Sequence, residues 1–156
     1  MRDSFINSIY KVTKLNNNVL CLVGDIGAFL LRNYIKDFPS NYYNLGAAEA
    51  NMVGMAAGLA MSGKIPFVYT ITPFITSRVY EQIKLDVCYN EANVKIVGVG
   101  SGVSYGTMGS THHSLEDIAI MRVLPNMVVI SPSDPQEVEE AVFAAMEHKG
   151  PVYIRL

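Results

Sequence analysis

The sequence contains little cysteine, little excess charge and no long apolar run. Of its 156 residues only two are cysteine, and 12 Lys and Arg stand against 14 Asp and Glu, for a formal net charge of -2. Cys21 and Cys88 lie in apolar surroundings outside any Cys/His cluster, which predicts reduced core thiols of an intracellular protein. The balanced charge offers no general surface for nucleic acid or an acidic membrane, because such surfaces need clustered Lys and Arg.

Segments that target a chain to a membrane are missing from the sequence as well. No apolar run approaches bilayer length, and the N-terminus lacks a basic stretch followed by an apolar one. We therefore expect a soluble, cytoplasmic protein with one domain over residues 1–156, long enough to bury a single core. Because the sequence stops on an apolar, strand-like run, we expect this domain to be cut from a longer protein.

Apolar runs and helix-like stretches alternate along the chain. Val19 to Val23, bounded by Asn on one side and Gly24-Asp25 on the other, suits a strand buried on both faces of a parallel sheet. Alternation of this kind is typical of α/β folds, in which helices cover both faces of a mainly parallel sheet and ligands bind beyond the carboxyl ends of the strands. Strands are predicted at 19–23, 42–45, 66–70, 94–99, 127–130 and 152–155, and helices at 2–14, 28–36, 47–62, 77–90, 114–122 and 135–148.

A segment of small residues at 45–60 surrounds a lone carboxylate, that of Glu49. Its Gly and Ala residues let another backbone approach closely, while Met and Val fill the remaining space. An unpaired buried carboxylate is costly, so Glu49 should be exposed, neutral or specifically partnered. The alternative is an ordinary acid in the first turn of a helix, where the macrodipole favours it.

The pattern around Glu49 resembles a known family. Gly46-x-x-Glu49, followed by Asn-Met-Val-Gly-x-Ala-x-Gly, is similar to the pyrimidine-binding domain of transketolases and 1-deoxyxylulose-5-phosphate synthases. The resemblance covers essentially the whole chain and implies a three-layer helix-sheet-helix domain of the thiamine diphosphate-binding fold. Four further segments match in the same order: Gly24-Asp25-Ile26-Gly27, Pro66-Phe67 leading to Phe74, Gly106 to Asp117, and Pro132-Ser133-Asp134.

The resemblance implies a cofactor site around Glu49. This catalytic glutamate would hold a proton at N1′ of the aminopyrimidine of thiamine diphosphate, and Phe74 would stack on that ring, with Asp25 and Arg78 as further cofactor-binding residues. The spacing from the aromatic residue to Arg78 is one residue longer than in the common transketolase pattern, so counting back from Arg78 would select Ile75 instead. Phe74 is preferred because only an aromatic face provides stacking energy; a plain core role for Phe74 is the alternative.

A glycine-rich loop at 98–110 precedes two adjacent histidines, His112 and His113. Glycine allows a backbone to approach a ligand closely, and Ser114 is a plausible N-cap of the helix that follows, with Asp117 in its first turn. No other residues at ligand spacing accompany the histidines, so a zinc site is not expected and no metal ligand is assigned.

The resemblance also assigns substrate contacts to this loop. His112 would line the substrate channel as a second catalytic residue and bind ketose hydroxyls, with His113 as a neighbouring substrate candidate. Met108 stands where the family usually has an Asp that contacts a sugar hydroxyl. The usual pentose phosphate substrates are therefore not assumed.

By the same resemblance, the chain forms half of an active site. The family holds Mg²⁺ and the diphosphate on a separate domain, so we expect a diphosphate-binding partner chain or domain, and a homo-oligomer, such as a dimer, formed through the 46–60 helix. The implied activity is a transketolase-type transfer of a two-carbon ketol unit between sugar phosphates in carbohydrate metabolism, with the domain inactive alone. Alternatives are a 1-deoxyxylulose-5-phosphate synthase, a beta-type chain of a 2-oxoacid dehydrogenase, and a non-catalytic flavodoxin-like binding module.

Overall fold

Six parallel strands form the middle layer of the protein, which a computed structural model describes over all 156 residues. Their order across the sheet is β2-β1-β3-β4-β6-β5, and every neighbouring pair is parallel. This confirms the predicted α/β class. The strands are β1 (Val19–Val23), β2 (Tyr42–Asn44), β3 (Ile65–Ile71), β4 (Lys95–Val99), β5 (Val128–Ile130) and β6 (Val152–Arg155).

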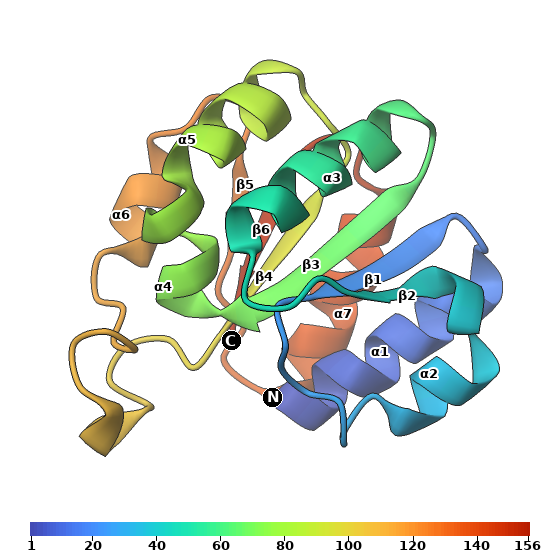
Figure 1. Cartoon of the computed structure of the whole chain (residues 1–156), viewed down its shortest axis with the longest axis horizontal. Coiled ribbons are helices and arrows are strands. Elements are labelled where there is room, and N and C mark those ends of the chain that lie inside the picture. The colour runs from blue at the N-terminus through green and yellow to red at the C-terminus, as the bar shows by residue number, and fades with distance from the viewer.

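Helices cover both faces of this sheet (Figure 1). α1, α2 and α7 lie on one face, and α3, α4, α5 and α6 lie on the other. None of the helices has the length and apolar character needed to cross a lipid bilayer. Their bounds are α1 (Arg2–Leu15), α2 (Arg32–Asp37), α3 (Glu49–Met61), α4 (Thr72–Ile75), α5 (Tyr80–Gln82), α6 (Asp117–Arg122) and α7 (Pro135–Glu147).

The central strands contribute side chains to two cores, one on each face of the sheet. In β1, Val19, Cys21 and Val23 face the core beneath α1 and α7, while Leu20 and Leu22 face the core beneath α3. Successive side chains of a strand point to opposite faces, so a continuous apolar run can fill both cores.

Both cysteines are free and buried, as the sequence predicts. Burial raises the pKa of Cys21 to about 12 and that of Cys88 to about 11, because the thiolate is poorly solvated in the core. Thiols of this kind are inert, so the cysteines serve packing.

Lys95 is fully buried at the start of β4. Its Nζ donates hydrogen bonds to the carbonyl oxygens of His148, at 2.8 Å, and Gly150, at 2.6 Å. Burial lowers the pKa of Lys95 from 10.5 to about 7. The lysine thus ties the end of α7 to the central strand.

Helical residues span nearly all of the predicted stretch at 77–90, but they do not form one α-helix. The segment after β3 consists of α4, a 3-10 turn at Ser77–Val79, α5 and a π-helix at Ile83–Tyr89. The first break lies at Thr76, whose φ and ψ of -116° and -85° are not helical. The Thr76 hydroxyl donates a hydrogen bond to the carbonyl of Thr72, at 2.7 Å, which closes the end of α4.

Two predicted helix starts also need correction. The helix expected from residue 28 begins at Arg32, and the one expected from residue 114 begins at Asp117. Ser114 is not an N-cap, because its backbone pairs with that of Gly102 through two hydrogen bonds of 2.9 Å in an antiparallel bridge. The N-cap position of α6 is occupied by Glu116.

Candidate functional site

The loops that follow β1, β2 and β3 meet at the carboxyl edge of the sheet, where Glu49 begins α3. Only 4% of Glu49 is exposed. A Cβ on Gly24 would lie 3.0 Å from the hydroxyl oxygen of Thr70 and 3.6 Å from Cγ of Glu49, so a larger residue here would press against Thr70. The hydroxyl of Thr70 is buried there without a hydrogen-bond partner within the chain.

Arg78 joins Glu49 to Phe74. Its Nη1 lies 3.1 Å from Oε2 of Glu49, and its Cζ lies 3.9 Å from the centroid of the Phe74 ring. The guanidinium therefore forms an ion pair and a cation–π contact at once. Ile75, the other candidate by spacing, is fully buried in the core, so the geometry favours Phe74 as the aromatic residue of the site.

His112 packs between two aromatic rings. Its imidazole lies edge-on to Phe74, with centroids 5.1 Å apart, and edge-on to Tyr105, at 5.5 Å. Nδ1 is 2.9 Å from the hydroxyl oxygen of Thr111. Tyr105 is held in turn by Arg2, whose Nη2 donates a hydrogen bond to the Tyr105 hydroxyl at 2.8 Å. The start of α1 thus helps to fix the loop that carries Tyr105 and His112, a role that sequence reasoning missed.

His113 lines an open groove beside this aromatic cluster. Its Nε2 lies 3.0 Å from the carbonyl oxygen of Gly106. A carbonyl only accepts, so Nε2 carries the proton and Nδ1 is left free. Met108 is 56% exposed on the turn Gly106–Met108 and does not line the groove. The groove has a volume of about 370 Å³ and is lined by Pro73, Phe74, Ser77, Arg78, Ser110, Thr111, His113 and Glu116.

Asp25 forms no hydrogen bond or ion pair with Glu49 or Arg78. It is exposed, with a φ of 55°, and its polar contacts are with Asn44 of the neighbouring strand. The backbone N–H of Asp25 donates to Oδ1 of Asn44, and Nδ2 of Asn44 donates to Oδ1 of Asp25, both at 3.2 Å. The structure therefore brings Glu49, Phe74 and Arg78 together but gives Asp25 a separate partner.

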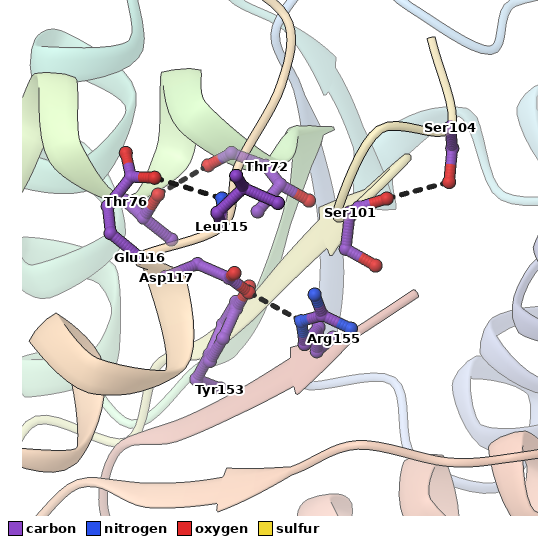
Figure 2. A network of polar contacts seen from close by, with 9 residues as sticks. All are labelled: Thr72, Thr76, Ser101, Ser104, Leu115, Glu116, Asp117, Tyr153 and Arg155. Atoms are coloured by element: carbon purple, nitrogen blue, oxygen red, sulfur yellow. Dashed lines mark hydrogen bonds and ion pairs between the residues drawn. The ribbon is translucent and has the colours of Figure 1, made fainter. Parts of the chain in front are cut away.

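A second buried carboxylate, Asp117, lies at the start of α6 and faces Tyr153 and Arg155 of β6 (Figure 2). Its Oδ2 accepts hydrogen bonds from the Tyr153 hydroxyl and from Nε of Arg155, each at 2.7 Å. Burial, together with the charge of Asp117, raises the pKa of Tyr153. The sequence places Asp117 in a first helical turn, but it does not reveal this network; the one signal is a charged residue, Arg155, in an otherwise apolar last strand.

Comparison with known protein families decides what kind of domain this is. The family model described as the pyrimidine-binding domain of transketolase matches residues 1–156. The chain belongs to this family. The resemblance predicted from Glu49 and its flanking motifs is thereby confirmed.

Relatives of this transketolase pyrimidine-binding domain include proteins named as enzyme subunits. The chain is 49% identical over 123 residues to a subunit of the apulose-4-phosphate transketolase of Actinobacillus succinogenes, covering 79% of this chain and 40% of that protein. It is 38% identical over 157 residues to a subunit of the 6-deoxy-6-sulfo-D-fructose transketolase of a Clostridium species, covering 100% and 49%. The chain therefore spans about half the length of the curated relatives it matches.

A solved structure agrees with this assignment. The chain superimposes on a split-gene transketolase, described as an inactive beta4 tetramer, with a TM-score of 0.88 and 37% identity, covering 99% of this chain and 50% of that one. The transketolase pyrimidine domain thus has the three-layer architecture that the sequence predicts.

Proposed function

We propose that this domain is the pyrimidine-binding half of a thiamine diphosphate-dependent transketolase, a transferase that moves a two-carbon ketol unit between sugar phosphates. The observation that carries the proposal is the joining of the buried Glu49 carboxylate to the face of Phe74 by a flat cation, the guanidinium of Arg78. Family membership supports the cofactor, since transketolases depend on thiamine diphosphate.

The residues of the site fit an aminopyrimidine. Such a ring needs a carboxyl group at its edge and an aromatic face beneath it, and Glu49 and Phe74 supply both. The contacts of the Arg78 guanidinium support this fit, because it is planar, donates a hydrogen bond to Glu49 and has its Cζ 3.9 Å from the Phe74 centroid. In this proposal Asp25 and Arg78 are neighbours of the bound cofactor.

The chain's own residues then have separate tasks. When bound, thiamine diphosphate supplies the carbon nucleophile that carries the two-carbon unit. Glu49 holds a proton at the pyrimidine N1′, and its burial keeps water from competing for that hydrogen bond. His112 and His113 bind substrate hydroxyls, and the free Nδ1 of His113 is suited to accept one. The exposed Met108, in place of an acidic residue, points to substrates other than the usual pentose phosphates.

The active site is completed by a second protein surface. We place Mg²⁺ and the diphosphate on a partner chain or domain, and a homo-oligomeric contact on α3, within the 46–60 segment. The outer side of α3 is open: a Cβ on Gly54 or Gly58 would meet no atom within 4 Å. Relatives named as enzyme subunits, and the likeness to a split-gene transketolase, support this arrangement. We expect the assembled enzyme to act in the cytoplasm and the domain to be inactive alone.

Reconstitution tests this function. The chain is mixed with a candidate diphosphate-binding chain, thiamine diphosphate and Mg²⁺, and ketol transfer from a ketose phosphate is followed. We expect Glu49→Gln to retain the fold but abolish turnover, whereas Glu139→Gln, at a half-exposed position on α7, should leave turnover unchanged. Near-normal turnover in Glu49→Gln would contradict the proposal.

A further inference from the structure

Arg78 makes both of the contacts that the proposed function assigns to the aminopyrimidine. It binds Oε2 of Glu49 at 3.1 Å and covers a face of Phe74 at 3.9 Å. We propose that Arg78 is a positioning residue that occupies the pyrimidine subsite before the cofactor arrives, holds Glu49 and Phe74 in place, and then moves aside. This inference rests on the proposed function, because it assumes that the subsite accepts an aminopyrimidine.

The burial of Glu49 explains why it needs a partner before the cofactor binds. The Glu49 side chain is only 4% exposed, and a buried carboxylate without a partner is destabilising. Arg78 is the charged group that meets it, so the arginine compensates the carboxylate while the subsite holds no other cation or hydrogen-bond donor. The same contact keeps the Phe74 ring oriented.

The contacts of Arg78 also allow its side chain to move out of the subsite. Its side chain is 50% exposed, and the ion pair with Glu49 is its one side-chain hydrogen bond within the chain. It projects from the short turn Ser77–Val79 at the edge of the groove, where rotation of a long side chain into solvent moves no backbone. A guanidinium attached by one ion pair and one stacking contact is displaced at modest cost.

Displacement has a measurable consequence, because arginine and aminopyrimidine compete for the same carboxylate and the same aromatic face. Removing the arginine should therefore strengthen binding of a pyrimidine. One half-exposed ion pair and one cation–π contact correspond to a gain of about three- to thirtyfold in affinity. A residue that held the cofactor would show the opposite effect.

The test uses 4-amino-5-(hydroxymethyl)-2-methylpyrimidine as probe, titrated into the 156-residue chain and followed by NMR. We expect Arg78→Gln to bind the probe about three- to thirtyfold more tightly than wild type. Arg78→Lys should fall between them, because an ammonium pairs with Glu49 but has no flat face for Phe74. Glu49→Gln should weaken binding. Arg32→Gln is the matched control, since Arg32 also stacks on a phenylalanine, with its Cζ 4.5 Å from the Phe29 ring.

A second readout needs no ligand. In the wild-type chain the side-chain Nε proton of Arg78 should be shifted upfield by the Phe74 ring, and this shift should disappear in Phe74→Leu and on saturation with the probe. An unshifted Arg78 signal in the wild type would overturn this inference but leave the proposed function standing. So would an Arg78→Gln variant that binds no more tightly than wild type while Glu49→Gln still weakens binding.

Failure of the proposed function has a different pattern. If the probe binds to none of the variants, or binds to Glu49→Gln as well as to wild type, the subsite is not one for an aminopyrimidine, and this inference falls with that assignment. The backbone spectrum of each variant, recorded without probe, checks that the fold is retained.

Discussion

Replacing Asp117 with alanine should destabilise the domain by about 3–4 kcal/mol. The change removes the shared acceptor of the Tyr153 hydroxyl and of Arg155 Nε, both at 2.7 Å. Loss of one partner of a buried ion pair costs about 3–5 kcal/mol. Because the Arg155 side chain is 23% exposed, its charge can be rehydrated, which lowers this part to about 2 kcal/mol. The Tyr153 hydroxyl, left without its acceptor in the core, adds about 1–2 kcal/mol.

Asp117→Asn removes the charge of the side chain but keeps its shape, so it separates the two contributions to stability. The amide oxygen can accept both hydrogen bonds, but they lose their charge assistance. Hydrogen bonds to charged groups stabilise proteins by roughly twice as much as neutral ones, so we expect a loss of about 1–2 kcal/mol. The alanine variant should therefore be less stable than the asparagine variant, and both less stable than wild type.

Urea unfolding followed by circular dichroism measures these values, provided that the variants share the wild-type slope of unfolding free energy against urea concentration. The matched control is Asp134→Ala, which removes an exposed N-cap whose Oδ1 accepts from the backbone N–H groups of Gln136, at 2.8 Å, and Glu137, at 2.9 Å. Such a cap is worth about 1 kcal/mol. If Asp117→Ala costs no more than Asp134→Ala, the buried network does not stabilise the fold as argued.

Three further predictions concern other parts of the fold. Unfolded Lys95 keeps a pKa near 10.5 while the folded value is about 7, so stability should rise with pH between these values, and Lys95→Met should flatten that rise in urea unfolding. Gly54→Ala should stabilise the isolated chain by about 0.5–1 kcal/mol, because its Cβ meets nothing, yet weaken assembly measured by ultracentrifugation if α3 is an interface. Gly100→Ala should cost about 1–3 kcal/mol more than Gly63→Ala in thermal unfolding; both glycines have a positive φ, but only at Gly100 would the Cβ clash with Tyr105.

Most of the sheet could be predicted from the sequence because its central strands are short, apolar and clearly bounded. The expected strand at 19–23 matches β1 at both ends, and all five of its residues are buried. The winding of the region after β3 could not, since residues 77–90 are compatible with one α-helix and nothing in their pattern marks the changes from 3-10 to α to π winding. The short helix α4 was also not predicted; its end at Thr76 is closed by the hydrogen bond to Thr72, which periodicity does not report.

The candidate site was only partly accessible to sequence reasoning. Glu49, Phe74 and Arg78 were found through the family resemblance, and they lie together in the structure. The network around Asp117 was missed because its partners, Tyr153 and Arg155, lie 36 and 38 positions further along the chain. Such pairings arise from the parallel order of β4 and β6 and the path of the loop between β4 and α6, and no local pattern encodes them.

The two buried carboxylates differ in how firmly their partners are held. Asp117 is held by a buried hydroxyl and by an arginine that is 23% exposed, both at 2.7 Å, so exchanging its partners would disrupt the core. Glu49 has one charged partner, at 3.1 Å, and the side chain of that partner is 50% exposed. A carboxylate whose partner can leave into solvent is free to bind a ligand in its place, and for this reason the proposed function assigns the cofactor contact to Glu49 rather than to Asp117.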